Sequence, residues 1–239
     1  MESRVSIAAL QSMKREGRKI VGVVAWDAQI ASIADRAGVD LISVGDSVGV
    51  NLWGRAPEEP VTVEEMLVCC KAVRRGVRRP LVSCDVPAGS DALRAAKRLA
   101  DEGGAEMVKV LGEPDLVRAI VKAGVAVFAE FHGDGVPAEE LVERAKRLQD
   151  AGASLLDFRH SGPVAGPAVA RAVSIPVIGG LGGGPWLDGR VRLAHTAIGY
   201  AAKWLDAGTE TYGNAAKLSL DALRALIDDV RSGRQIKGS

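Results

Sequence analysis

Charged side chains follow several short apolar runs in this chain, at the points where buried strands would end. Asp46 and Asp85 each come at the end of such a run, Lys109 lies within a third, and Glu130 and Arg159 end two more. Carboxylate oxygens are the ligands that Mg²⁺ prefers in proteins. Arginine binds carboxylates and phosphates through paired hydrogen bonds. If one fold brings these side chains together, the chain has the means to bind a metal ion and a small acid.

The segments that carry these residues are typical of a barrel of parallel strands. Short runs that are apolar throughout, as in strands buried on both faces, alternate with segments of helical period, and the unit repeats eight times. In such a barrel the carboxyl ends of all strands meet at one face, where the chemistry takes place. We therefore predict a (β/α)8 TIM barrel that spans residues 1–239 as a single domain, with its eighth strand near residues 191–194. A helix within residues 5–15 would cover the closed end, and residues 218–231 predict a C-terminal amphipathic helix.

Several of these residues also have an ordinary structural interpretation. An aspartate after a strand often caps the next helix, so each carboxylate alone is an ambiguous signal. His132 and His160 could each be a general base or a hydrogen-bonded loop residue. Arg159 could bind a substrate anion or form a salt bridge with Glu130. The glycine run at residues 179–184 favours phosphate binding only weakly, because it contains neither Lys nor Ser.

Composition and charge argue against several classes of protein. The chain has 239 residues, of which 47% are hydrophobic and 26% charged, as in an ordinary globular protein. A net charge of +1, with only short basic clusters, argues against a nucleic-acid partner. The three cysteines form neither a disulfide framework nor a zinc-ligand spacing, and no apolar run is long enough to span a bilayer. We expect a cytoplasmic protein with no membrane partner.

Motifs that can be compared with known families occur along nearly the whole chain. They are Trp26-Asp27-Ala28, Val44-Gly45-Asp46-Ser47, Pro60-Val61-Thr62-Val63-Glu64-Glu65, Asp85-Val86-Pro87-Ala88-Gly89-Ser90, Val108-Lys109 and Ile175-Pro176-Val177-Ile178-Gly179. In these motifs the chain resembles the ketopantoate hydroxymethyltransferases, which add a one-carbon unit to 3-methyl-2-oxobutanoate in pantothenate biosynthesis. The resemblance implies a barrel of the phosphoenolpyruvate mutase and isocitrate lyase superfamily. It also implies Mg²⁺ as a cofactor, 5,10-methylenetetrahydrofolate as a co-substrate, and a homo-oligomer.

The resemblance assigns roles to the residues that match the family's motifs. Asp46 and Asp85 correspond to carboxylates on the metal side and would also contact the substrate. Ser47 corresponds to a contact of the substrate carboxylate, and Lys109 to a substrate-binding lysine. Two carboxylates and a bidentate 2-oxo acid would be enough for Mg²⁺, which usually keeps several waters. The metal would polarise the keto oxygen and so acidify the neighbouring C–H bond.

Three positions depart from the family's pattern. Where the family has Lys-Leu-Glu-Gly, this chain has Lys-Val-Leu-Gly, so Glu113, two residues further on, becomes the candidate third metal ligand. Glu130 stands at the position of a family histidine, and Arg159 at the position of the glutamate assigned as the proton-moving base. An arginine cannot accept a proton near neutral pH. Glu130 or His132 would then move the proton, while Lys109 and Arg159 complete the predicted catalytic set.

These observations lead to one main prediction and two alternatives. The main prediction is a Mg²⁺-dependent transferase of the hydroxymethyltransferase type, which forms a C–C bond next to a 2-oxo acid through a metal-stabilised enolate. The first alternative is a C–C or C–P lyase or mutase on a dianionic 2-oxo acid, such as oxaloacetate or phosphonopyruvate, whose second anionic group Arg159 would bind. The second alternative is a non-catalytic barrel homologue that binds its ligand without turnover.

Overall fold

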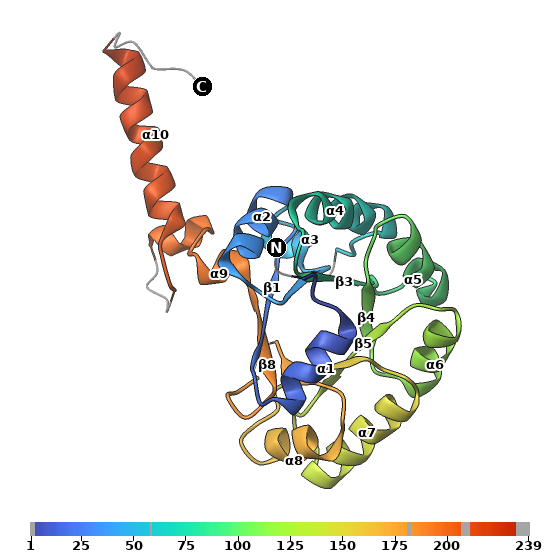
Figure 1. The fold of residues 1–239 in the computed structure, drawn as a ribbon. Coiled ribbons are helices and arrows are strands. Elements are labelled where there is room, and N and C mark those ends of the chain that lie inside the picture. The colour runs from blue at the N-terminus through green and yellow to red at the C-terminus, as the bar shows by residue number, and fades with distance from the viewer. Residues whose placement is uncertain (1–2, 58, 181–182, 207–210, 233–239) are drawn as a thin grey trace. The chain divides into compact units, whose positions relative to one another are not determined.

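Eight parallel strands close into a barrel in the order of the sequence, from β1 to β8 (Figure 1). The computed structural model describes residues 3–57, 59–180, 183–206 and 211–232. The strands are β1 (Ile20–Val24), β2 (Leu41–Val44), β3 (Leu81–Asp85), β4 (Met107–Leu111), β5 (Val127–His132), β6 (Leu155–Arg159), β7 (Val177–Gly179) and β8 (Gly189–Leu193). The predicted (β/α)8 barrel is confirmed, although β8 begins at Gly189, ahead of the predicted start.

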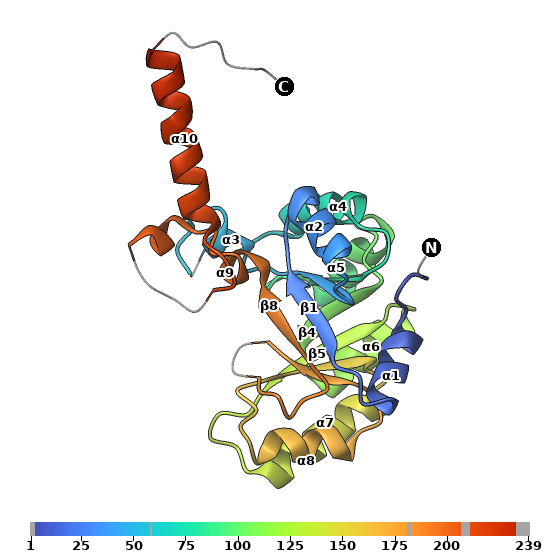
Figure 2. The ribbon, with the colours of Figure 1, turned by 60° about the vertical axis from the view of Figure 1, so that its left-hand side comes forward.

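Helices cover the outside of the barrel (Figures 1 and 2). They are α2 (Ala28–Ala37), α4 (Val63–Gly76), α5 (Ala92–Asp101), α6 (Pro114–Lys122), α7 (Ala138–Asp150) and α8 (Ala165–Ala172). A short helix, α3 (Val48–Asn51), lies in the long connection between β2 and α4. None of the helices in the described ranges is long and apolar enough to cross a membrane.

The chain divides into two compact units, Met1–Arg192 and Leu193–Ser239. The first unit holds β1 to β7 and all but the last residue of β8. The second unit holds α9 (Ala194–Ala197), a 3-10 helix (Ala202–Leu205) and α10 (Ala215–Arg231), which is the helix predicted at the C-terminus. Within this unit the N–H of Tyr212 donates to the carbonyl oxygen of Ala197 at 2.8 Å. That residues 1–239 form a single domain stays a prediction.

The ends of the helices are set by caps that the sequence encodes. The side chain of Asp27 accepts a hydrogen bond from the N–H of Ile30 at 2.9 Å and so caps the first turn of α2. The same helix ends at Gly38, whose φ of 88° lies in the left-handed region that favours glycine. Thr62 and Glu65 form a capping box at the start of α4. Because each cap fixes the start or the end of a helix, it also fixes the length of the loop beside it.

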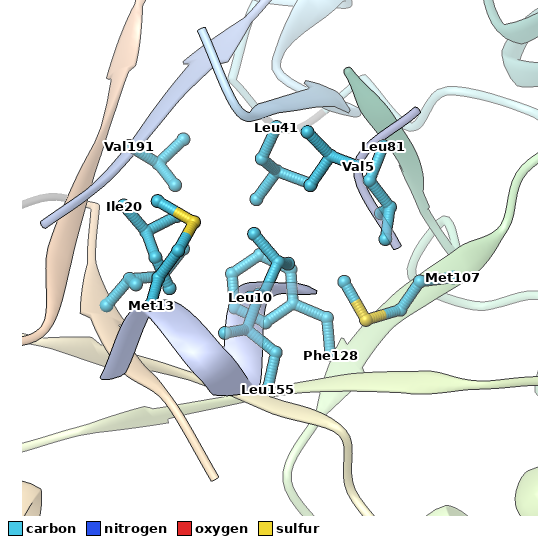
Figure 3. Packing of buried hydrophobic residues seen from close by; sticks show 11 residues of the cluster. Val5, Leu10, Met13, Ile20, Leu41, Leu81, Met107, Phe128, Leu155 and Val191 are labelled. Atoms are coloured by element: carbon cyan, nitrogen blue, oxygen red, sulfur yellow. The ribbon is translucent and has the colours of Figure 1, made fainter. Parts of the chain in front are cut away.

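The closed end of the barrel is filled by the N-terminal helix, α1 (Ile7–Arg15). Its Leu10 and Met13 are buried among residues at the beginnings of the strands, as Figure 3 shows. The full cluster is Val5, Leu10, Met13, Ile20, Leu41, Leu81, Met107, Phe128, Leu155, Ile178 and Val191. The predicted capping helix is confirmed, and it leaves the opposite face, where the strands end, for chemistry.

Inward-facing residues of the strands form two layers inside the barrel. Successive side chains of a strand point to opposite faces, so residues two apart share a face. In β3 the inward series runs from Leu81 through Ser83 to Asp85, and in β4 it runs from Met107 to Lys109. The apolar members of these series lie in the cluster of Figure 3, and the charged members lie nearer the carboxyl ends. The alternation thus places a polar layer directly above the apolar core.

Three acidic side chains bind the backbone at the amino ends of the strands. Each accepts a hydrogen bond from the first backbone N–H groups of a strand and pairs with a cation. They are Asp40 (Val21 N, 3.0 Å; Arg79), Glu106 (Val82 N, 3.0 Å; Arg4) and Asp188 (Val177 N, 2.8 Å; Lys14). Strand ends that would otherwise be unpaired are satisfied in this way.

Lys14 of α1 is the most buried of these cations and should make a measurable contribution to stability. Its Nζ donates to the carbonyl oxygens of Ala170 and Ile175 at 2.7 and 2.9 Å and lies 2.9 Å from Asp188 Oδ2. We expect Lys14→Met to lower the free energy of unfolding by about 2 to 4 kcal/mol, because it leaves buried acceptors without their charged donor. Urea denaturation followed by circular dichroism measures this loss.

Lys146→Met is the matched control, since it removes the exposed pair of Lys146 with Glu143 on α7. This control should change the free energy of unfolding by less than about 1 kcal/mol. Equal effects of the two substitutions would contradict the role assigned to Lys14.

Candidate active site

The polar layer brings together side chains from neighbouring strands. Strand pairing sets Asp85 of β3 opposite Lys109 of β4, and Glu130 of β5 opposite Asp157 of β6. All four side chains are largely buried. Since each lies at or near the carboxyl end of its strand, the layer forms the floor of the face where barrels of this kind bind their substrates.

The ammonium group of Lys109 lies at the centre of this layer. Its Nζ is 3.3 Å from Asp85 Oδ2, 3.0 Å from Glu130 Oε2 and 3.5 Å from Asp157 Oδ2. An ammonium group has three N–H donors. Lys109 would therefore contact a substrate only by giving up one of these partners, and Asp157 is the most distant of them.

Asp85 is held from its other side by two buried hydroxyl groups. Ser83 donates to the hydroxyl oxygen of Ser43 at 3.0 Å, and Ser43 donates to Asp85 Oδ1 at 3.4 Å. The two serines are directly opposite each other in the pairing of β2 with β3. One oxygen of Asp85 therefore faces the serines while the other faces Lys109.

Glu130 is the most heavily engaged carboxylate of the layer. Its Oε1 accepts from Arg159 Nη1 at 2.7 Å and lies 3.1 Å from His132 Nε2, while its Oε2 faces Lys109. His132 and Arg159 are opposite each other in the pairing of β5 with β6, two residues beyond Glu130 and Asp157. The salt bridge between Arg159 and Glu130, one of two interpretations open from the sequence, is thus present.

Burial and charge shift the pKa values of these groups in opposite directions. Burial raises the pKa of Asp85 to about 6, with Lys109 opposing the shift and Asp46 adding to it. Burial likewise raises the pKa of Asp157, against the effects of Lys109 and of the N–H of Gly180. Burial would also raise the pKa of Glu130, but Lys109 and Arg159 outweigh it and lower this pKa to about 2.

Lys109 itself is fixed in its charged form. Burial alone would lower its pKa, yet the three carboxylates around it outweigh burial and raise the pKa well above its ordinary value. The pair of Arg159 with Glu130 similarly raises the pKa of Arg159 despite burial. Both groups therefore keep their positive charge at neutral pH.

The end of β2 carries the predicted residues Asp46 and Ser47. Trp26 anchors this turn, because its buried Nε1 donates to the carbonyl oxygen of Gly45 at 2.7 Å. A Cβ at Gly45 would lie 3.1 Å from Ser47 Oγ and 3.7 Å from Asp85 Oδ2, so both groups border the same point. Asp46 is exposed and close enough to Asp85 to raise its pKa. The turn therefore adds a carboxylate and a hydroxyl to the polar layer.

The oxygen donors at this site suit a Mg²⁺ ion that keeps several waters better than one that is held by protein ligands alone. Within the described residues, no three His, Cys, Asp or Glu side chains are grouped to hold a metal ion by themselves. Mg²⁺ commonly takes only one or two carboxylates and completes its octahedron with water and substrate oxygens. Asp46 and Asp85 offer two such carboxylates, and their mutual repulsion would be relieved by a divalent cation. The residues present therefore fit the predicted metal.

Glu113, the candidate third metal ligand, is placed differently. It precedes α6, its side chain is exposed, and its Oε1 lies 3.4 Å from Arg144 Nη2 of α7. None of its described contacts is with Asp46 or Asp85. The structure thus brings together the predicted residues of β2 to β6 but leaves Glu113 on the surface beside a different partner.

Asp157 is the site residue that the sequence analysis missed. It precedes the predicted Arg159 by two residues, so the two share a face of β6. Counting back two residues from Arg159, to the next side chain on the same face of the strand, would have identified Asp157. In the glycine run, Gly180 donates its N–H to Asp157 Oδ1 at 2.9 Å, whereas Leu181 and Gly182 lie outside the described residues.

The raised pKa of Asp85 predicts a pH-dependent cost to stability. A proton on Asp85 stabilises the fold at low pH, and this stability is lost as the pH rises from about 4 through about 6. We therefore expect Asp85→Asn, in EDTA at pH 8, to raise the free energy of unfolding by about 1 to 3 kcal/mol. Urea denaturation between pH 4 and pH 8 measures the difference.

Asp115→Asn is the control, because this aspartate on α6 has a fully exposed side chain. It should leave the pH dependence of the wild type unchanged. A wild type whose stability relative to Asp85→Asn is the same at pH 4 and pH 8 would contradict the assignment.

Several solved structures of enzymes have the same fold. The chain superposes on a phosphonopyruvate hydrolase complexed with oxalate and Mg²⁺ with a TM-score of 0.64 at 16% identity, over 95% of this chain and 88% of that one. For phosphoenolpyruvate phosphomutase from Streptomyces platensis subsp. rosaceus the TM-score is 0.63 at 16% identity, over 96% and 88%. At such low identity these similarities show the fold alone.

Sequence comparison is more specific. Residues 4–135 and 132–235 match the profile of a family described as ketopantoate hydroxymethyltransferase. The chain is 35% identical over 244 residues to a 3-methyl-2-oxobutanoate hydroxymethyltransferase from Geobacillus kaustophilus, covering 92% of this chain and 87% of that protein. It is 34% identical over 253 residues to the protein of that name from Alkalilimnicola ehrlichii, covering 96% and 91%. The chain therefore belongs to the ketopantoate hydroxymethyltransferase family.

Proposed function

We propose that this chain is a Mg²⁺-dependent hydroxymethyltransferase that attaches a one-carbon unit to carbon 3 of 3-methyl-2-oxobutanoate. Its family and the names of its relatives support the reaction. The observation that carries the proposal is the contact of Asp85 with Lys109 in a buried polar layer at the carboxyl ends of the strands. Carboxylates there can hold a metal, and fixed cations can attract an acid.

Asp46 and Asp85 would hold the metal ion. When bound there, Mg²⁺ polarises the keto oxygen of the substrate and weakens the neighbouring C–H bond. A solved structure of the same fold, the phosphonopyruvate hydrolase, is complexed with Mg²⁺ and oxalate, which supports the proposal that this fold can bind a metal and a small acid. Glu113 as a third ligand gains no support from its contact with Arg144.

The chain's own polar groups would orient the substrate. Ser47, beside Gly45 and Asp85, would donate its hydroxyl hydrogen to the substrate carboxylate. Lys109 would bind the same carboxylate after releasing its most distant partner, Asp157. The one-carbon donor, 5,10-methylenetetrahydrofolate, stays a prediction, as do the homo-oligomer and the cytoplasmic location.

A second candidate function follows from Arg159. Its side chain is 30% exposed at the end of β6, where the guanidinium group could bind a second anionic group of the substrate. The chain would then be a lyase or mutase that acts on a dianionic 2-oxo acid such as oxaloacetate. Against this candidate, Glu130 already neutralises the arginine at 2.7 Å, so a second anion would have to displace a buried carboxylate.

The metal assignment predicts that Asp85→Ala abolishes the binding of both Mg²⁺ and 3-methyl-2-oxobutanoate. The physical reason is that one of two carboxylate ligands is lost from a site that keeps few protein ligands. Isothermal titration calorimetry measures both affinities. Asp115→Ala removes an exposed acid from α6 and should bind both as the wild type does; unchanged binding in Asp85→Ala would rule out the assignment.

The two candidate functions predict different effects of Arg159→Gln. Under the main proposal, 3-methyl-2-oxobutanoate binds the wild type, oxaloacetate does not, and the substitution changes the Kd of the monoacid by less than about tenfold. Under the second, oxaloacetate binds and the substitution weakens it by about 2 to 5 kcal/mol, the usual loss when one partner of a buried charge pair is removed. Thermal shift with Mg²⁺ and each acid identifies the ligand, and calorimetry measures Kd.

A further inference from the structure

The polar layer contains one buried carboxylate to which the proposed function gives no part, Asp157. Its side chain is 5% exposed, on β6 between the apolar Leu155 and Arg159. Its Oδ1 accepts the N–H of Gly180 at 2.9 Å, and its Oδ2 lies 3.5 Å from Lys109 Nζ. Burying a carboxylate that has one backbone hydrogen bond and one long ion pair costs free energy.

Among the carboxylates around Lys109, Asp157 is held least tightly. Glu130 receives Arg159 and His132 on one oxygen and Lys109 on the other, at 2.7, 3.1 and 3.0 Å. Lys109 and Arg159 outweigh burial and lower the pKa of Glu130 to about 2, which makes it a weak acceptor of a proton from carbon. Asp85 is assigned to the metal ion under the proposed function. Asp157 therefore remains as the carboxylate whose oxygen can take up a proton.

The position of Asp157 suits proton transfer better than that of His132. Asp157 is opposite Glu130 in the strand pairing, within the layer of Lys109, whereas His132 lies two residues further along β5. Two residues of a strand correspond to about 7 Å along that strand. His132 is also half exposed, so water competes for it.

A glycine keeps space in front of the Asp157 carboxylate. A Cβ built on Gly180 would lie 3.5 Å from both Oδ1 and Oδ2, at ordinary van der Waals distance. The absence of this methyl group leaves room for one substrate carbon against the carboxylate. A carbon at the position of this methyl group would be in contact with both oxygens of a carboxylate that is itself 5% exposed.

We propose that Asp157 is the general base that removes the proton from carbon 3 of the 2-oxo acid, a role that rests on the proposed function. The C3–H bond breaks, its proton moves to Asp157 Oδ2, and its electron pair forms the bond between carbons 2 and 3. The keto oxygen takes the negative charge. The charged groups that face Asp157 are Lys109 from β4, Glu130 from β5 and Arg159 from β6, with the N–H of Gly180 after β7.

The test measures exchange of the C3 proton of 3-methyl-2-oxobutanoate with D₂O by NMR, with MgCl₂ and without a one-carbon donor. The wild type should exchange this proton, and Asp157→Asn should slow the exchange by at least about 100-fold, the usual effect of losing a general base. Calorimetry should find the Kd of the acid changed by less than about threefold. The exchange rate of the wild type should rise with pH as Asp157 loses its proton, and that of Asp157→Asn should not.

Gly180→Ala is the second variant, in case Asp157→Asn does not fold. The added methyl group fits without a clash but fills the space in front of the carboxylate, so exchange should fall at least about tenfold in a folded protein. Asp134→Asn, an exposed acid beyond the end of β5, is the control and should exchange as the wild type does.

The outcomes separate this inference from the proposed function. A wild type that binds the acid without exchanging its proton would overturn the proposed function and the role of Asp157 with it. A wild type that exchanges the proton, with Asp157→Asn or Gly180→Ala equally active, would overturn the role of Asp157 alone. Loss of exchange in His132→Gln, with Asp157→Asn active, would assign the proton to the histidine instead.

Discussion

The structure of the site depends on one buried ammonium group, that of Lys109. Taking a lysine out of water is costly unless opposite charges surround it, and here carboxylates from β3, β5 and β6 do so. The carboxylates depend on the lysine in turn, since two of them have raised pKa values even beside it. Removal of Lys109 would leave three buried carboxylates without a counter-charge, so the positions of these strand ends are coupled through the lysine.

The two ends of the barrel differ in how their buried acidic side chains are compensated. At the amino end, Asp40, Glu106 and Asp188 accept backbone N–H groups and pair with cations, and α1 fills the interior with apolar side chains. That arrangement satisfies every acid locally and stabilises the fold. At the carboxyl end, acids outnumber cations, so the free energy that their burial costs has to be offset by the stability of the rest of the barrel. This division is the usual one for such barrels.

The neighbours of Glu130 show how charge assigns different properties to chemically similar groups. Glu130 and Asp157 are opposite each other on adjacent strands, yet the pKa of the first is lowered and that of the second is raised. The difference arises because burial outweighs the cations at Asp157, whereas at Glu130 the close contacts of Lys109 and Arg159 together outweigh burial. General acid and base roles require that the environments of two carboxylates make their pKa values differ in this way. The arginine on β6 thus tunes the layer even though it cannot itself accept a proton.

The sequence by itself determined the barrel, the helix over its closed end and the convergence of Asp85, Lys109, Glu130 and Arg159. It could do so because apolar runs, caps and period are local properties, and parallel strands of one barrel must end at one face. Only the tertiary structure decided which side chains meet: that Lys109 contacts three carboxylates, that Asp157 is one of them, and that Glu113 pairs with Arg144 instead. The physical reason is that contacts inside a barrel depend on the stagger between strands and on the length of each side chain, which no single strand encodes.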